Sequence, residues 1–265
     1  MGKAIQNAEI DNGRSFDWGR TSLDYARYRD IYPEEFYQKL LHMDIGTKGQ
    51  KILDIGTGTG VLPRNLYRYG AAFTGIDISE NQIAQAVMLA EKQNMEIVFQ
   101  CVPAEETVFP AQSFDVVTAC QCFPYFDHAR LAGHLYEMLK PNGRFVVMYM
   151  AWLPLEDVIA ERSEELILKY NPSWTGCREV RRTLFVPEAY EDYFTVEKRE
   201  LFDLKVPFNR ESWNGRIKAC RGIGASLPQE KIEEFEKEHQ KLLIETAPEE
   251  FEIQHYATIT VLRKK

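Results

Sequence analysis

The chain has 265 residues, of which 45% are apolar and 27% charged, as in ordinary globular proteins. This length is sufficient for one large domain with a full hydrophobic core. The formal net charge of −8 argues against a nucleic-acid partner, because binding a duplex requires a concentrated basic face. The densest basic cluster, formed by Arg178, Arg181 and Arg182, is too small to supply one.

The five cysteines are odd in number and follow no paired spacing. Cys120 and Cys122 form an isolated C-x-C in an apolar stretch, without a second pair or a nearby pair of histidines, so we expect no metal site. Residues 1–13 are polar and unlike a secretory signal, and no apolar run approaches the roughly 20 residues of a membrane span. We therefore expect a cytoplasmic protein with reduced thiols and no membrane partner.

Strand-like and helix-like segments alternate through the first half of the chain. Ser79 is expected to cap one of the helices together with Gln82, and the run Pro141-Asn142-Gly143 is expected to break the chain before the fifth strand. The alternation predicts a parallel sheet with helices on both faces. The predicted strands are 51–55, 72–76, 96–101, 114–120 and 144–150, and the predicted helices are 59–69, 79–92 and 127–139.

The second half of the chain has a different character. We expect a helix over 155–170, an irregular region over 171–193, and two helical segments, 210–221 and 228–246, between two long strands. We interpret 1–265 as a single domain with four kinds of segment. These are a helical lid at 1–50, a cofactor-binding core at 51–150, substrate-cap segments at 151–193 and 208–250, and C-terminal strands at 194–207 and 251–263.

The stretch Ile52–Gly60 reads Ile-Leu-Asp-Ile-Gly-Thr-Gly-Thr-Gly, in which a buried strand runs into three glycines. Glycine lets a ligand lie directly on the backbone, and bare N–H groups favour a polar or anionic ligand. Asp77, at the end of the next strand, can accept hydrogen bonds from ribose hydroxyls. A dinucleotide fingerprint prefers G-x-G-x-x-G and needs no acid before it, so Asp54 and the glycine spacing argue against an NAD enzyme.

This stretch resembles motif I of the class I S-adenosylmethionine-dependent methyltransferases. Thr74–Ser79 resembles their second motif, Pro103–Glu105 with 109–117 resembles their third and fourth strands, and Leu139–Phe145 resembles the turn before their fifth strand. The resemblance covers about 51–150, in the order of the family, and favours its small-molecule branch (methyltransferase type 11-like). It implies an α/β, Rossmann-like, doubly wound and mostly parallel seven-stranded sheet, with an antiparallel last strand and a helical cap insert.

The resemblance also implies which residues hold S-adenosyl-L-methionine and its product S-adenosyl-L-homocysteine. Asp54 and the glycine backbone would hold the methionine part, Asp77 the ribose, and Cys120 or Gln121 would approach the sulfonium. An N-terminal arm bearing tyrosines and an arginine would cover the cofactor. The full set is Asp54, Gly56, Thr57, Gly58, Gly60, Asp77, Ile78, Ala104, Glu105, Cys120 and Gln121, with Tyr25, Tyr28 and Arg29 from the arm.

The implied acceptor is a small molecule. The run Cys122–Tyr125 stands where amino-methyltransferases acting on nucleobases or glutamine carry Asn/Asp-Pro-Pro-Tyr, but cysteine is a poor hydrogen-bond acceptor for an amine. Trp213 and Arg216 share one face of a predicted helix, which favours a planar or carboxylate-bearing acceptor. We expect substrate contacts from Tyr125, Tyr149, Trp152, Trp213 and Arg216, without assigning a catalytic residue.

One alternative from another class stays open. A non-catalytic S-adenosylmethionine-binding regulatory module would keep the glycine motif and would act on a partner protein instead of a substrate. The aromatic cap argues mildly for the enzyme. We expect a monomer or a homodimer.

Overall fold

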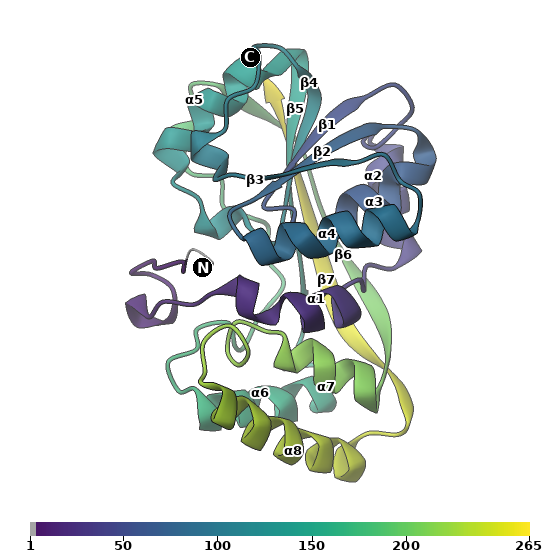
Figure 1. Cartoon of the computed structure of the whole chain (residues 1–265), viewed down its shortest axis with the longest axis vertical. Helices are drawn as coiled ribbons and strands as arrows, with labels where there is room; N and C mark the ends of the chain where they lie inside the picture. Colours follow the sequence, from purple (N-terminus) through teal and green to yellow (C-terminus); the bar gives the residue numbers. More distant parts are fainter. Residues whose placement is uncertain (1–3) are drawn as a thin grey trace. The chain divides into compact units, whose positions relative to one another are not determined.

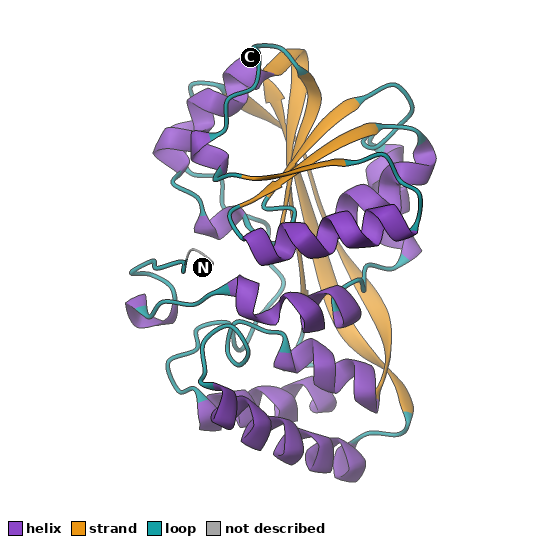
Figure 2. Ribbon diagram, in the orientation of Figure 1, coloured by secondary structure: helices purple, strands orange, loops and turns teal. Residues whose placement is uncertain are grey.

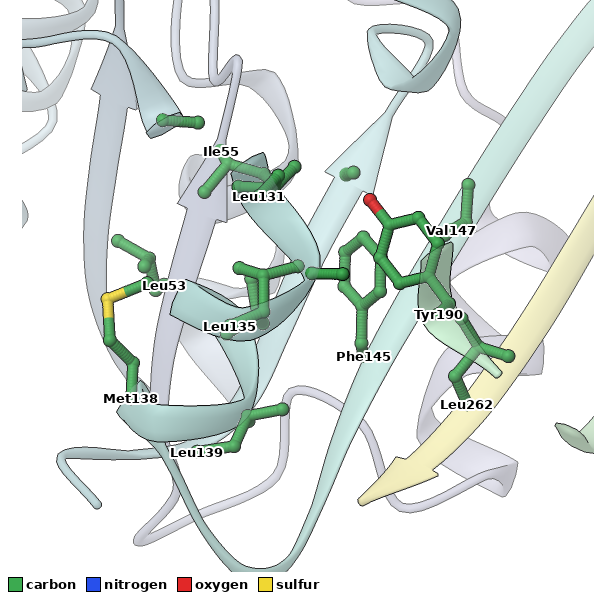
Figure 3. Close-up of a cluster of buried hydrophobic side chains, with 14 of the residues drawn as sticks. Leu53, Ile55, Leu131, Leu135, Met138, Leu139, Phe145, Val147, Tyr190 and Leu262 are labelled. Atoms are coloured by element: carbon green, nitrogen blue, oxygen red, sulfur yellow. The ribbon is translucent and has the colours of Figure 1, made fainter. Parts of the chain in front are cut away.

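The computed structural model describes residues 4–265. Seven strands form one sheet in the order β3-β2-β1-β4-β5-β7-β6. Strands β1 to β5 are parallel to one another, and β7 is antiparallel to them (Figure 3), as the resemblance implied. The strands are β1 (Lys51–Ile55), β2 (Ala72–Asp77), β3 (Val98–Cys101), β4 (Phe114–Cys120), β5 (Leu139–Trp152), β6 (Phe194–Asn209) and β7 (Glu250–Lys264).

Contacts divide the chain into two compact units, which we describe separately. The core unit comprises Pro33–Met150, Arg182–Phe202 and Ala257–Lys265. The helical unit comprises the described residues up to Tyr32, Ala151–Arg181 and Asp203–Tyr256. Strands β5, β6 and β7 each contribute residues to both units.

The core unit contains the parallel strands and four helices, which flank the strands on both sides (Figures 1 and 2). Its helices are α2 (Glu34–His42), α3 (Val61–Leu66), α4 (Glu80–Lys92) and α5 (His128–Met138). Helix α5 buries Leu131, Leu135 and Met138, which recur at helical spacing, against the strands (Figure 3). The same cluster includes the stacked rings of Phe145 and Tyr190, whose centroids are 5.7 Å apart.

The helical unit contains α1 (Ser22–Tyr28), α6 (Val158–Tyr170), α7 (Arg210–Lys218) and α8 (Gln229–Thr246). Helix α6 begins later than predicted, because Asp157 caps it by accepting the N–H groups of Ile159 and Ala160. None of the helices in residues 4–265 combines the length and apolar character needed to cross a membrane.

The predicted break before the fifth strand is wrong in its extent. Strand β5 begins at Leu139 and includes the Pro-Asn-Gly run, although its pairing with β4 is irregular between Phe114 and Val116. Asn142 has φ 61° there. The run therefore makes a bulge within a long strand, since one left-handed residue is enough to absorb the bend.

Candidate functional site

The turn that follows β1 depends on glycine. Gly56, Gly58 and Gly60 have φ values of 63°, 56° and 72°, a left-handed conformation that side chains disfavour. At Gly56, a Cβ atom would lie only 2.7 Å from the Sγ atom of Cys122. The turn is therefore packed tightly from behind, and its backbone is fixed by hydrogen bonds from the N–H groups of Thr57 and Gly60 to the carbonyls of Ile76 and Thr57, both at 2.9 Å.

Asp54 supports this turn from below. Its side chain is buried, and Oδ1 accepts a hydrogen bond of 2.6 Å from the Thr118 hydroxyl, which lies opposite it on β4. Burial raises the pKa of Asp54 to about 6, although hydrogen bonds from Thr118 and Thr57 oppose the shift. This carboxylate therefore ties β1 to β4 two residues before the first glycine of the turn.

Asp77 joins the glycine turn to the end of β2. One carboxylate oxygen accepts the Gly58 N–H and the other accepts the Ser79 N–H, both at 2.9 Å. The side chain is half-buried, and this burial raises its pKa. A carboxylate has about four lone-pair positions, so further acceptor capacity remains for ribose hydroxyls.

The end of β4 has a constrained backbone. Gln121 has φ 69°, and its backbone N–H and side-chain amide donate to the carbonyls of Met148 and Met150, at 2.9 and 2.6 Å. A non-glycine residue held in this region stores strain, as is frequent at functional sites. The thiol of Cys122 donates to the Ile55 carbonyl at 3.1 Å and is thereby turned toward β1.

The segment after β3 completes the same edge of the sheet. Ala104 and Glu105 begin a short 3-10 helix, with Ala104 buried and Glu105 accepting the backbone N–H of Asp127 at 2.9 Å. Because the strands are parallel, their carboxyl ends meet at one edge, where α/β proteins bind ligands. The predicted cofactor residues from Asp54 to Gln121 all lie at or beside this edge of the core unit, and their donors and acceptors suit a nucleoside with an amino-acid tail.

The predicted lid residues lie in α1 and directly after it, in the helical unit. The guanidinium of Arg29 stacks 4.4 Å from the ring centroid of Tyr25. The ring of Tyr28 lies on Gly215 of α7, and its hydroxyl donates to Glu211 at 3.1 Å. A contact between these residues and the cofactor stays a prediction.

Three of the predicted substrate residues come together in the helical unit. The rings of Trp152 and Trp213 meet edge to face at 5.6 Å, and the Arg216 guanidinium lies 4.8 Å from the Trp152 ring. Trp213 is fully buried, which gives it a packing role whatever its part in binding. Tyr125 and Tyr149 are half-buried residues of the core unit. All five substrate assignments stay predictions.

Sequence reasoning missed a buried polar network around Trp213. The indole N–H donates to the Ser163 hydroxyl at 2.9 Å, and this hydroxyl also contacts His239 at 3.0 Å. The other ring nitrogen of His239 contacts the Asn214 oxygen at 2.8 Å. Burial lowers the pKa of His239 to about 3, so the ring is neutral. Ser163 is fully buried and donates to the Ile159 carbonyl, so the set is structural and not a hydrolytic triad.

A second missed residue is Glu164, which holds the other tryptophan in place. Its carboxylate accepts the Trp152 indole N–H at 2.6 Å and the backbone N–H of Arg178 at 2.8 Å. Burial raises the pKa of Glu164. No spacing in the sequence could have revealed either arrangement, because the partners come from segments far apart in the chain.

The central segment of the chain is similar to known methyltransferase domains. A family of methyltransferase domains matches residues 53–147. The ubiquinone biosynthesis O-methyltransferase of Coxiella burnetii is 35% identical over 107 residues, covering 40% of this chain and 46% of that protein. The corresponding protein of Bradyrhizobium diazoefficiens is 34% identical over 128 residues, covering 48% and 50%. The chain thus spans about half the length of the curated relatives it matches.

Solved structures resemble a much larger part of the chain. A protein of Bacillus halodurans described as a methyltransferase has a TM-score of 0.53 at 17% identity, covering 85% of this chain and 97% of that one. The phosphoethanolamine N-methyltransferase 2 of Haemonchus contortus, solved with phosphomonomethylethanolamine and S-adenosylhomocysteine, has a TM-score of 0.55 at 18% identity, covering 97% and 58%. At these identities the likeness shows the fold alone.

Proposed function

We propose, because residues 53–147 belong to the methyltransferase domain family, that this chain transfers a methyl group from S-adenosylmethionine to a small-molecule acceptor. The observation that carries the proposal is the hydrogen-bonded edge in which Asp77 holds the glycine turn while keeping acceptor capacity. Gly58, which donates to Asp77, is one of three glycines of this turn with positive φ.

S-adenosylmethionine, when bound, supplies a methyl group on a sulfonium whose departure leaves a neutral thioether. The work of the chain is therefore to bind, orient and exclude water. The turn from Gly56 to Gly60 would hold the methionine part, Asp77 the ribose, and Ala104 with Glu105 the adenine edge. Gln121, fixed through its amide, would lie nearest the reacting centre. A general base is optional, since its need depends on the pKa of the acceptor.

The finer proposal concerns the acceptor, which we take to be planar or to carry a carboxylate. Its support is the grouping of Trp152 with Arg216 in the helical unit. The curated relatives are O-methyltransferases by name, but they match the chain over only about half of their length. The acceptor atom is therefore left open, and so is the alternative of a non-catalytic regulatory module.

We predict that Asp77→Asn weakens the binding of S-adenosylhomocysteine by at least about tenfold, because it removes a charged hydrogen-bond acceptor. Isothermal titration calorimetry measures this directly. Asp115→Asn is the matched control, since Asp115 lies near the amino end of β4 and pairs with Lys140. This control should leave the affinity within about twofold.

Two outcomes would contradict the proposal. If S-adenosylhomocysteine does not bind the wild-type protein at millimolar concentration, the cofactor assignment is wrong. If it binds but no acceptor in a broad metabolite screen releases S-adenosylhomocysteine from S-adenosylmethionine, the regulatory module becomes the better reading.

A further inference from the structure

The position of Arg216 in helix α7 is fixed by its neighbours in the sequence. The two residues Trp213 and Asn214 are fixed by the buried network around Ser163. Gly215 lies so close to the Tyr28 ring that a Cβ atom would be 2.3 Å from Cδ2. Three consecutive residues are thus anchored to α6, α8 and α1, so Arg216 has little freedom to turn away.

Within residues 4–265, the charge of Arg216 has no carboxylate partner. The side chain is only 5% exposed, and its Nε and Nη1 atoms are buried without any hydrogen-bond partner among the described residues. Burial lowers the pKa of Arg216 to about 9, and the positive charge of Arg29 lowers it further. The other titratable groups that act on it are Cys220, Tyr25 and Tyr32, and none is a carboxylate.

The pKa of nearby His255 shows the effect of the Arg216 charge. Burial lowers the pKa of His255 to about 3, and the positive charge of Arg216 contributes to this shift. The ring is therefore neutral, with Nδ1 donating to the Ile253 carbonyl at 2.9 Å. A buried guanidinium next to a second cation is costly, because no carboxylate among the groups that act on it offsets its lost hydration.

The geometry around Arg216 also limits what could bind it. Trp152 covers one face of the guanidinium at 4.8 Å, and the indole is itself held by Glu164. A guanidinium can bind either a carboxylate or a phosphate through two parallel N–H···O bonds. The single negative charge of a carboxylate balances the one buried positive charge of Arg216, whereas a phosphate dianion would leave an excess negative charge that is costly to bury.

We propose that Arg216 binds the carboxylate of a small organic acid, and that this acid is the methyl acceptor. The second clause rests on the proposed function, whereas the anion site itself does not. The carboxylate would supply the missing negative charge and the missing acceptors together. Helix α7 and Trp152 would hold the guanidinium ready for it, so little ordering is needed on binding.

The test is a calorimetric titration of the full chain with acetate, succinate and benzoate. The neutral amides of the three acids and inorganic phosphate serve as comparison ligands. The variant is Arg216→Gln. The control is Arg162→Gln, which removes an exposed positive charge from α6 of the same unit. We expect at least one carboxylate to bind, its amide not to bind, and Arg216→Gln to raise the Kd at least tenfold, with the control within twofold.

The proposal is overturned if no carboxylate binds at millimolar concentration, if Arg216→Gln binds as the wild type does, or if phosphate binds more tightly than every carboxylate. Titration with S-adenosylhomocysteine separates this result from the cofactor claim. Wild type and Arg216→Gln should bind S-adenosylhomocysteine equally. If the wild type does not bind it at millimolar concentration, the proposed function is refuted and the anion site is unaffected.

A second measurement needs no ligand. In the free protein, Arg216→Met replaces an uncompensated charge by an apolar side chain of similar length, so we expect Tm to rise by about 2–4 °C. A fall in Tm would show that the guanidinium is kept for packing against Trp152, and would overturn the proposal that its charge is kept for a ligand.

Discussion

At the scale of single residues, the site depends on carboxylates whose burial is costly. Asp54 is 2% exposed, and its hydrogen bonds come from hydroxyl groups and not from a cation. The ionised Asp54 carboxylate, which directly precedes the glycine turn, therefore lowers the stability of the folded state. Such a conflict between stability and arrangement is characteristic of functional sites.

This conflict predicts a pH dependence for Asp54. Its pKa is about 6 in the folded protein against an ordinary value of 3.8, so the folded state holds the proton more strongly. Its contribution to stability is greatest below pH 4, falls between about pH 4 and pH 6, and stays low above. Two pKa units correspond to about 3 kcal/mol. The Tm of Asp54→Asn relative to wild type should therefore rise by roughly 5–10 °C as the pH increases from 4.5 to 7.5.

The control for this prediction is Asp115, whose pKa is shifted in the opposite direction. The ion pair with Lys140 and the Lys51 N–H lower the pKa of Asp115, although its partial burial opposes them. That stability is complete above the ordinary pKa of 3.8 and is lost only below it, so the Tm difference between Asp115→Asn and wild type should stay nearly constant from pH 4.5 to 7.5. Thermal melts of the three proteins across this range would refute the assignment if the Asp54→Asn difference were flat.

At the scale of elements, the sequence placed most strands and the one predicted helix cap correctly. The predicted strands 51–55 and 114–120 coincide with β1 and β4, because short apolar runs ending in glycine or a loop have clear limits. Ser79 caps α4 as predicted, accepting the Gln82 N–H. The start of α6 was misplaced by three residues, since Leu155 fits the apolar pattern but is exposed and precedes the Asp157 cap.

The contact of α1 with α7 makes a further prediction. Gly215→Ala should lower Tm, because its methyl group would enter the Tyr28 ring and overpacking costs about 1–3 kcal/mol. Gly133→Ala is the matched control, since it also lies in a helix but meets only the Tyr193 hydroxyl at 3.4 Å. The control should keep or raise Tm through higher helix propensity.

The structural reading of that pair is tested by the double variant. Tyr28→Ala removes the ring that the new methyl group would strike, so the effects of Gly215→Ala and Tyr28→Ala should be far from additive. Additive losses in Tm would mean that the glycine serves some purpose other than admitting the ring.

At the scale of the whole molecule, three strands are shared by the two compact units. Strands β5, β6 and β7 each pass from one compact unit into the other without interruption. Separate unfolding of either unit would break continuous hydrogen-bonded strands. We therefore predict a single calorimetric transition that both Asp54→Asn in the core unit and Arg216→Met in the helical unit displace. Two transitions, each moved by one variant alone, would contradict this.

The sequence by itself predicted the resemblance of residues 53–147 to methyltransferase domains, the parallel strands β1 to β5 and the antiparallel last strand. It could do so because the glycines, Asp54 and Asp77 act within a few residues of strand ends, where local pattern fixes position. The tertiary structure alone decided that Thr118 faces Asp54 and that Ser163, His239 and Glu164 hold the tryptophans. It also decided that Arg216 is buried without a counter-charge, because burial and pairing are set by segments distant in the chain.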